Sequence, residues 1–423
     1  MTTLPKLSNV HRTELKNGIV LLVSENSAAD VIATRIFIRA GSCYEKPEKA
    51  GLANLLGALL TKGCDGLSSL EIAERVESVG ASLSADTATD YFVLSFKSVT
   101  ADFTQILELA TRLLRSPTFP EAEVELEKRI ALQDVRLQKE QPFSVAFEQL
   151  RQVMYKNHPY ASSGLGDETT ISNLTREDLV NFYQTYFRPD NIVISIAGRI
   201  DQEDARQQIE KLFGDWHLVD TQLPAMKVSF PQTKPQQVVT PQPTQQSVIM
   251  LGYLGASVHS ADYAGLKLLS TYLGNGLSSR LFIELREKLG LAYDVSAFYP
   301  TRQFSSSFVV YMGTAPENTT TALEGLRREV DLLSASKLEE NALQAAKNKI
   351  LGQYALGKQT NGQIAQIYGW YEILGLGITF DQKFQKDIAA LTSADVIHIA
   401  SQYLKEPFVS VIGQEEAINR IIA

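Results

Sequence analysis

The chain has 423 residues, of which 44% are hydrophobic and 21% charged, enough to bury a substantial core and to divide into two or more domains. Lysine and arginine number 40 against 48 acidic residues, and this net charge of -8 argues against nucleic acid or an anionic membrane as the main partner and favours a peptide or a protein. Because there are only two cysteines, Cys43 and Cys64, and no apolar run long enough to span a bilayer, we expect a cytoplasmic protein without a membrane segment.

The first predicted helix, residues 51–63 (GLANLLGALLTKG), has two different faces. Its leucines gather on one side, as in a buried amphipathic helix. Asn54, Gly57 and Ala58 gather on the other side, which has neither the charges of a solvated surface nor the bulk of a core. A glycine such as Gly57 costs a helix about 1 kcal/mol relative to alanine. We interpret this blank face as the remnant of a lost site, with close packing against a neighbouring helix as the alternative.

The same helix can be compared with a known metal-binding pattern. Zinc hydrolysis on a helix needs two histidines at i and i+4 and a carboxylate as general base, and one such pattern is H-x-x-E-H. Residues 54–58 read N-L-L-G-A, so every position with a chemical role is vacant. The five histidines are scattered singly and offer no substitute pair, and His158, in a His-Pro-Tyr sequence, is expected to anchor a loop.

An internal repeat organises the chain. GLSSLEIAERVESVG at 66–80 and GLSSRLFIELREKLG at 276–290 both open with Gly-Leu-Ser-Ser and end in glycine, which is the pattern of a capped helix. Alternating apolar and polar residues, typical of half-buried strands, follow each of them. The segments 174–198 and 391–413 also match, each a helix leading through a proline turn into a strand that stops at glycine. These matches predict two similar domains.

The composition changes between the two halves. Residues 217–246 contain five prolines among glutamine and threonine, the composition of an extended connector. We therefore predict domains at 1–216 and 247–423, joined by a linker at 217–246. The fold class is α+β, with two homologous domains, each a mixed, mostly antiparallel sheet covered by helices. The longest predicted helical stretches are 101–115, 121–140, 142–154, 317–334 and 337–357.

The stretch GSCYEKPEKAGLANLLGALLTKG resembles the zinc helix region of the pitrilysin or insulinase family of metallopeptidases, which reads close to G-L-A-H-x-x-E-H-x-x-F-K-G there. This family includes the mitochondrial processing peptidases and smaller bacterial relatives, and the resemblance covers nearly the whole chain. It implies a third zinc ligand at the position of Asp134, with a further carboxylate at Glu127. Because Asn54, Gly57 and Ala58 supply neither ligands nor base, no zinc is expected in this chain. Asp134 and Glu127 are then interpreted as a solvated helix face.

The second half retains a pair of residues typical of the family. In LREKLGLAY, Arg286 stands near the end of the predicted helix and Tyr293 at the start of the following strand. The resemblance implies that this pair reaches a zinc site, where it holds the substrate backbone and stabilises the developing oxyanion. A guanidinium and a phenol supply directional donors to a carbonyl oxygen. The alternative is an exposed helix arginine and a tyrosine that packs in a strand.

The resemblance also implies where a peptide binds. In relatives the substrate adds as a strand beside the first domain's sheet, with main-chain hydrogen bonds giving affinity. The glycine-rich loop LGNGLSSR is also similar to the family, and its Gly274 and Gly276 allow mobility or close approach, although turn geometry alone also explains them. The residues expected at the peptide-binding edge are Ser82, Leu83, Ser84, Ala85, Asp86, Thr87 and Ala88.

Bacterial members of the family often work as heterodimers in which one chain carries the zinc motif and the other the Arg/Tyr pair. The leading hypothesis is therefore that this chain is the non-zinc-binding Arg/Tyr subunit of a heterodimeric zinc metalloendopeptidase. It is inactive alone, with Zn²⁺ on the homologous partner subunit; the sequence leaves open whether it forms a homodimer where that partner is absent. One alternative is a structural or peptide-holding scaffold without a role in catalysis. A weaker alternative is an active homodimeric metallopeptidase with an unrecognised site around Asp134 and Glu127.

Overall fold

A computed structural model describes residues 10–218, 220–226 and 228–422 of the chain. The chain divides into two compact units built from interleaved segments. The first unit contains 1–135, 163–226 and 355–381, and the second contains 136–162, 227–354 and 382–423. In the described part of the chain, no helix combines the length and apolar character that crossing a membrane requires.

The first unit is built on a six-stranded sheet with the order β1-β2-β8-β3-β7-β6. Only β2 and β8 run parallel, and the other neighbours are antiparallel. The central strand β8 is buried along its whole length, which places the core on both faces of the sheet. The strands are β1 (Val10–Glu14), β2 (Val20–Glu25), β3 (Val31–Ile38), β6 (Ser82–Thr87), β7 (Phe92–Val99) and β8 (Ile192–Gly198), with a small hairpin of β4 (Gly63–Cys64) and β5 (Leu67–Ser68).

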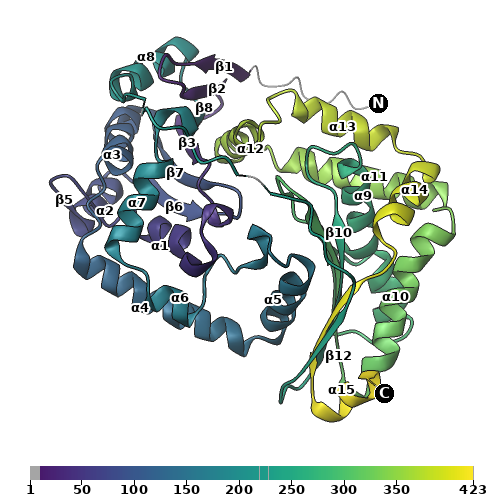
Figure 1. Cartoon of the computed structure of the whole chain (residues 1–423). Helices are drawn as coiled ribbons and strands as arrows, with labels where there is room; N and C mark the ends of the chain where they lie inside the picture. Colours follow the sequence, from purple (N-terminus) through teal and green to yellow (C-terminus); the bar gives the residue numbers. More distant parts are fainter. Residues whose placement is uncertain (1–9, 219, 227, 423) are drawn as a thin grey trace. The chain divides into compact units, whose positions relative to one another are not determined.

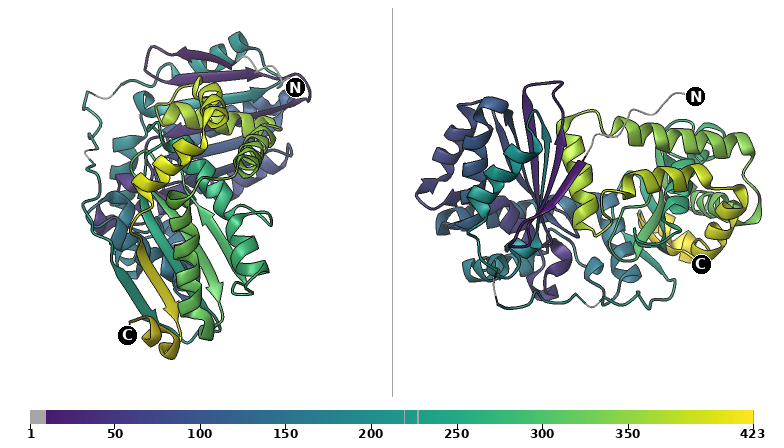
Figure 2. Two further views of the ribbon diagram at one scale, coloured as in Figure 1. Left: turned by 90° about the vertical axis from the view of Figure 1, so that its right-hand side faces the viewer. Right: turned by 90° about the horizontal axis from the view of Figure 1, so that it is seen from above.

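Helices cover both faces of this sheet (Figures 1 and 2). One face carries α1, α2, α3 and α8, which contact β6, β7 and β2, while α12 packs against β3 and β8 on the other. Apolar stripes along these helices supply the core, as in α3, where the buried residues recur at helical spacing. The helices are α1 (Leu52–Leu59), α2 (Ser69–Glu77), α3 (Phe103–Arg115), α4 (Glu121–Glu140), α6 (Glu168–Ser172), α7 (Arg176–Tyr186), α8 (Gln202–Phe213) and α12 (Asn361–Ile373).

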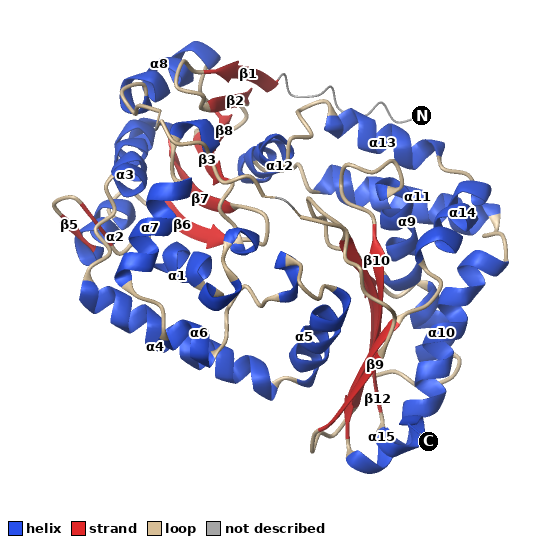
Figure 3. Cartoon of the chain, in the orientation of Figure 1, coloured by secondary structure: helices blue, strands red, loops and turns tan. Residues whose placement is uncertain are grey.

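The second unit has a five-stranded sheet with the order β11-β12-β10-β13-β9. Here β13 and β9 run parallel and the other neighbours antiparallel. Figure 3 shows the strands between α5 on one side and α9, α10 and α14 on the other. The strands are β9 (Gln237–Pro241), β10 (Ser247–Gly255), β11 (Asp294–Phe298), β12 (Ser306–Thr314) and β13 (Phe408–Gly413). The helices are α5 (Pro142–Met154), α9 (Tyr263–Gly274), η6 (Phe282–Glu287), α10 (Thr319–Ala335), α11 (Glu340–Leu356), α13 (Phe380–Ala390), α14 (Ser393–Tyr403) and α15 (Glu415–Ile422).

The two sheets share one topology, so the predicted fold class of two similar α+β domains is confirmed. Strands β6, β7, β3, β8 and β2 of the first unit follow the same order and the same directions as β11, β12, β10, β13 and β9 of the second. In both sheets the single parallel pair lies in the equivalent place. The repeat in the sequence therefore corresponds to a repeat in the fold, to which the first unit adds the extra strand β1.

Each unit includes a helix from the opposite half of the sequence. Helix α5, from the first half, packs on β10 and β13, whereas α12, from the second half, packs on β3 and β8. Glycines allow both approaches. A Cβ atom added to Gly252 of β10 would lie 2.5 Å from the sulfur of Met154, and one added to Gly369 of α12 would lie 2.3 Å from the Phe37 ring. Larger residues at these glycines would push the helices off the sheets.

The connector predicted at 217–246 is only partly extended chain. Residues 219 and 227 lie outside the described residues, and 228–236 have no regular structure. Residues Gln237–Pro241 form β9, which pairs with β13 at the edge of the second sheet. Proline is tolerated at a sheet edge because no partner strand needs its missing N–H group, so a proline-containing segment can still become an edge strand.

Candidate functional site

The blank face of α1 packs against strand β6. The hydroxyl of Thr87 donates a hydrogen bond to the carbonyl oxygen of Ala53 at 2.9 Å. A Cβ atom on Gly57 would lie only 2.8 Å from the same hydroxyl oxygen. Gly57 therefore provides the room that Thr87 occupies. The neighbour on this face is a strand, whereas the close-packing alternative expected a helix.

The positions of the degenerate zinc motif do not fit a zinc ion. Asn54 and Ala58 are half-buried on α1, and Asp134 is exposed on α4 without a hydrogen bond or ion pair to any described residue. Nowhere in the described residues do three or more His, Cys, Asp or Glu side chains come close enough to hold a metal ion. A catalytic zinc site needs three protein ligands of these kinds. Asn54, Ala58 and Asp134 therefore do not form such a site.

Glu127 differs from the prediction of a solvated helix face. Its side chain is only 9% exposed, and its carboxylate lies 3.0 Å from the ammonium group of Lys62, shortly after α1. This ion pair joins α4 to the end of the vacant motif helix. A buried carboxylate needs such a partner, because an unpaired charge in the interior is costly. The pattern of α4 alone gives no sign of this pairing, since Lys62 is distant in sequence.

A second carboxylate, Glu45, holds the beginning of α1 and was not predicted. It accepts hydrogen bonds from the backbone N–H groups of Gly51, at 3.0 Å, and Ala53, at 2.5 Å. Burial raises the pKa of Glu45 to about 8, although both hydrogen bonds act to lower it. Gly51 has a φ of +96°, which glycine adopts readily. Glu45 replaces the usual N-cap side chain from a position well before the helix, outside the spacing at which caps are sought in sequences.

The predicted peptide-binding residues form an exposed edge. Strand β6 comprises Ser82–Thr87, with Ala88 just beyond it, and has β7 as its one neighbour among the described strands. Exposed and half-buried residues alternate along it, with Ser82, Ser84 and Asp86 exposed. The other side of β6 therefore presents backbone groups to which a further strand could pair. Peptide binding at this edge stays a prediction.

Arg286 lies on a π-helical segment, η6, where the repeat predicted an ordinary capped helix. The backbone N–H of Lys288 donates to the carbonyl oxygen of Ile283 at 3.0 Å, a bond that spans five residues. The guanidinium of Arg286 is exposed and lies 4.9 Å from the centroid of the Phe282 ring. It makes no hydrogen bond or ion pair with any described residue. Arg286 therefore has its donors free for another molecule.

Tyr293 is also displayed to solvent. It is 59% exposed and directly precedes β11, where its backbone N–H donates to the carbonyl oxygen of Gly313 at 2.9 Å. That bond fixes the main chain, while the phenol is left outside the core. The alternative of a tyrosine that packs in a strand is therefore wrong. Arg286 and Tyr293 stand on either side of the turn that contains Gly290, whose φ is +63°.

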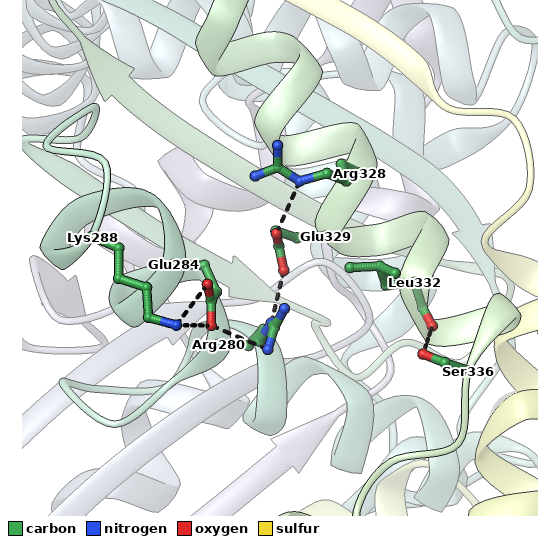
Figure 4. Close-up of polar contacts among 7 residues, drawn as sticks. All are labelled: Arg280, Glu284, Lys288, Arg328, Glu329, Leu332 and Ser336. Carbon is green, nitrogen blue, oxygen red and sulfur yellow. Dashed lines mark hydrogen bonds and ion pairs between the residues drawn. The ribbon is translucent and has the colours of Figure 1, made fainter.

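Ion pairs hold the segment that carries Arg286 (Figure 4). Arg280 donates to the carboxylate of Glu329 on α10 at 2.7 Å, and the Glu329 side chain is only 2% exposed. Glu284 lies 3.2 Å from Arg280 and 3.0 Å from Lys288, so it extends the network along η6. Charges spaced four residues apart meet on one face of a helix. The network anchors η6 to α10 and leaves Arg286 outside it.

The two loop glycines are explained by geometry. A Cβ atom on Gly274 would lie 1.8 Å from the backbone nitrogen of Ala297, so the end of α9 can approach β11 only with glycine there. The hydroxyl of Ser296 donates to the carbonyl oxygen of Gly274 at 2.7 Å. Gly276 has a φ of +80°, which favours glycine in the following turn. Close approach accounts for the first glycine and turn conformation for the second.

Two family models match the chain in succession. Residues 20–168 match "Insulinase (Peptidase family M16)", and residues 173–350 match "Peptidase M16 inactive domain". The first match includes the vacant motif helix and β6. The second includes Arg286, Tyr293 and the network that anchors η6.

Relatives and solved structures extend this similarity over almost the full length. The chain is 25% identical over 400 residues to "Uncharacterized zinc protease YmxG" of Bacillus subtilis, covering 94% of this chain and 97% of the relative. An "Uncharacterized zinc protease" of Rickettsia bellii is 24% identical, with 96% and 97% covered. A peptidase M16 inactive domain from Pseudomonas fluorescens has a TM-score of 0.89 at 24% identity, covering 96% and 98%. A protease from Helicobacter pylori has a TM-score of 0.90 at 21% identity, covering 97% and 100%. Models of one family match both halves of the chain, and the two solved structures share its fold. The chain therefore belongs to peptidase family M16, the insulinase family.

Proposed function

We propose that this chain is the non-zinc-binding subunit of a heterodimeric zinc metalloendopeptidase, in which Arg286 and Tyr293 act at a site carried by a homologous partner. One combination of features supports the proposal above all. The motif helix has neither ligands nor base, yet Arg286 and Tyr293 are both exposed, and the Arg286 guanidinium, which lies over the Phe282 ring, makes no hydrogen bond or ion pair with a described residue. An exposed arginine on a segment anchored by a separate ion-pair network, followed by an exposed tyrosine at the start of the next strand, is suited to contact another molecule.

The chemistry of this chain's residues follows from their donors. The Arg286 guanidinium presents fixed N–H groups and the Tyr293 phenol one O–H group, and all can donate to the carbonyl oxygen of a bound peptide. Donors placed where negative charge develops lower the barrier to attack on a carbonyl. In the proposed complex the two residues hold the peptide backbone and stabilise that charge. Zn²⁺ would be supplied by the partner and would provide the activated water.

A reconstituted complex tests the proposal. The partner to use is an M16 chain with H-x-x-E-H intact and the Arg/Tyr pair missing, and the readout is hydrolysis of a quenched fluorescent peptide. We expect activity only when both chains and zinc are present, and Arg286→Ala should lower turnover by about 10²-fold, as loss of an oxyanion donor typically does. Arg420→Ala, at an exposed arginine of α15, is the matched control and should leave turnover unchanged. Robust hydrolysis by the purified chain alone would refute the proposal.

A second candidate function is a peptide-holding or scaffolding role without catalysis. The open edge of β6 favours it, because an edge strand can bind a peptide whether or not a metal is nearby. This role predicts that Arg286→Ala and Tyr293→Phe leave the function of the complex unchanged. The third possibility, a homodimeric peptidase centred on Asp134 and Glu127, has no such support, because Glu127 is paired with Lys62 and Asp134 is exposed.

The proposal places the heterodimer in the cytoplasm. Cys43 and Cys64 are both buried and form no disulfide, which agrees with a compartment where thiols stay reduced. In the absence of the partner the chain is either a monomer or a homodimer. Size measurement of the purified chain with and without the partner would test both assembly states.

A further inference from the structure

A large cavity lies wholly within the first unit, beside the β6 edge. Its volume is about 950 Å³, and its walls come from β3, β6, β7, α12 and the loops that precede β3 and α12. Such a volume can hold several side chains of a bound peptide. The edge strand takes part directly, since Ser82 and Ser84 both line the cavity. A smaller hollow that continues along β6 shares Arg35, Ser84 and Ser95 with it and reaches Asp86.

The charge of the cavity is of one sign. Its lining contains two cationic side chains, Arg35 of β3 and Lys97 of β7, and neither Asp nor Glu. Arg35 donates one hydrogen bond, to the carbonyl oxygen of Thr34 at 3.0 Å, and neither cation forms an ion pair with a described residue. Asp86 is the carboxylate that acts on Arg35 from outside the cavity. In a chain whose net charge is -8, a cavity with two cations and no acid is unusual and favours an anionic occupant.

The strand register sets the distance of each cation from the edge. Ser82 lies opposite Lys97, so Lys97 is one strand in from β6. Ser84 lies opposite Ser95, which in turn lies opposite Arg35, so Arg35 is two strands in. Neighbouring strands are about 4.8 Å apart, which puts Lys97 about 10 Å from the axis of a strand added to β6. A lysine and a glutamate side chain together span that distance, and Arg35 lies deeper along the same face.

We propose that this cavity is a side-chain pocket for peptides paired with β6, and that Lys97 and Arg35 select peptides with Asp or Glu facing the sheet. The inference rests on the peptide-binding role proposed above for this chain, and it adds the class of peptide. Side chains of an added strand alternate between its two faces, so acidic residues at every second position would meet the pocket. Charge-assisted hydrogen bonds from ammonium and guanidinium groups to carboxylates are among the stronger polar contacts.

The test uses the purified full-length chain without a partner and two labelled peptides. One is a β-strand-forming octapeptide with glutamate at every second position, and the other has glutamine at those positions. We expect the glutamate peptide to bind about tenfold more tightly in fluorescence anisotropy, a preference reduced by added salt. Its binding should also slow amide hydrogen exchange across Ser82–Thr87, which locates the peptide at the edge.

Variants of Lys97 and Arg35 test whether the pocket causes the preference for the glutamate peptide. Lys97→Gln should reduce it and the double variant Arg35→Gln/Lys97→Gln should abolish it. The control Lys16→Gln/Arg129→Gln removes two exposed cations of the same unit outside the cavity and should keep it. Lys97 is itself exposed, so Lys97→Gln remains folded even if the double variant does not. Equal binding of the two peptides, absence of binding by both, or an unchanged preference in Lys97→Gln would overturn the inference.

The peptide-binding test of the pocket and the peptidase test of the proposed function can fail independently. Arg286→Ala lies outside the cavity and should keep the glutamate preference of the lone chain. If Arg286→Ala impairs the reconstituted peptidase but no glutamate preference exists, the pocket inference fails and the proposed function stands. If the preference exists but Arg286→Ala has no effect on turnover, the pocket stands and the proposed catalytic role fails.

Discussion

Thr87 of β6 donates its hydroxyl hydrogen to the carbonyl oxygen of Ala53 in α1 at 2.9 Å, at the place where Gly57 has no side chain. Helix α1, which contains the vacant motif positions, is therefore joined to the edge strand by a direct hydrogen bond. Gly57 cannot bind a metal, but it has a packing role, because its missing side chain leaves room for the Thr87 hydroxyl.

Gly57→Ala is expected to destabilise the chain although alanine is the better helix former. The gain in helix propensity is about 1 kcal/mol, but the new Cβ would lie 2.8 Å from the Thr87 hydroxyl, and we expect a net loss of about 1 kcal/mol. Urea denaturation measures it. Gly352→Ala in α11 is the matched control, because its Cβ meets nothing within 4 Å and should stabilise. The double variant Gly57→Ala/Thr87→Ala should lose less than the sum of the single variants, and strict additivity would contradict the contact.

Tyr293→Phe is expected to lower turnover of the reconstituted complex by about tenfold while leaving stability unchanged, because it removes one exposed O–H donor. Peptide hydrolysis and thermal unfolding are measured on the same preparations. Tyr403→Phe gives the opposite pattern. Its hydroxyl donates to Asp262 at 2.8 Å, so this variant should lose about 1 kcal/mol of stability and keep its turnover. A Tyr293→Phe complex with full activity would argue for the scaffolding role.

Glu329→Ala is expected to cost about 2 kcal/mol, because it removes the buried carboxylate that pairs with Arg280 at 2.7 Å. Amide exchange should also become faster in η6, which the network anchors to α10. Glu284→Ala removes the more exposed carboxylate of the same network, whose side chain is 20% exposed, and should cost less than about 1 kcal/mol. Equal losses in the two variants would show that burial of Glu329 does not matter.

His158 is expected to make the chain sensitive to acid. Its buried Nδ1 accepts a hydrogen bond from the backbone N–H of Tyr160 at 3.0 Å, and burial lowers the pKa of His158 from 6.5 to about 4. Because the folded state holds the neutral form and the unfolded state protonates near pH 6.5, stability is full above that pH and falls as the pH drops toward 4. The loss is on the order of 3 kcal/mol.

The matched variants are His158→Asn and His259→Asn. Asparagine at 158 keeps an acceptor for the Tyr160 N–H but does not titrate, so the acid side of its stability curve should be flatter than that of the wild type. His259 is exposed, and its replacement should leave the curve unchanged. Parallel acid slopes in the wild type and His158→Asn would exclude His158 as the cause.

Much of the fold could be predicted because its signals are local. Helices predicted at 121–140 and 142–154 coincide with α4 and α5, and hydrophobic periodicity with capping residues marks such segments. The repeated Gly-Leu-Ser-Ser segments led to two similar domains, and the shared sheet topology confirms them. At 66–80 the capping pattern is real, since Ser68 and Glu71 form a capping box at the start of α2.

What could not be predicted depends on contacts between distant residues. The second Gly-Leu-Ser-Ser segment becomes π-helical, and its local pattern does not reveal the bond from Arg280 to Glu329. Nor does the sequence near Glu127 reveal Lys62 as its partner. For the site, the resemblance identified Arg286 and Tyr293, and the structure adds that both are exposed. The cavity beside β6 depends on three strands from the first half of the sequence and a helix from the second half, a combination that no single segment encodes.

The reciprocal placement of α5 and α12 means that neither half of the sequence is self-sufficient. A fragment that ended at the connector would lack the helix that covers β3 and β8, and the complementary fragment would lack the helix that covers β10 and β13. A protease that nicked the connector would thus produce two interdependent pieces, each completing the other's layer. A chain cut short at that point would expose one face of the sheet that remained, so the two halves depend on being made as one polypeptide.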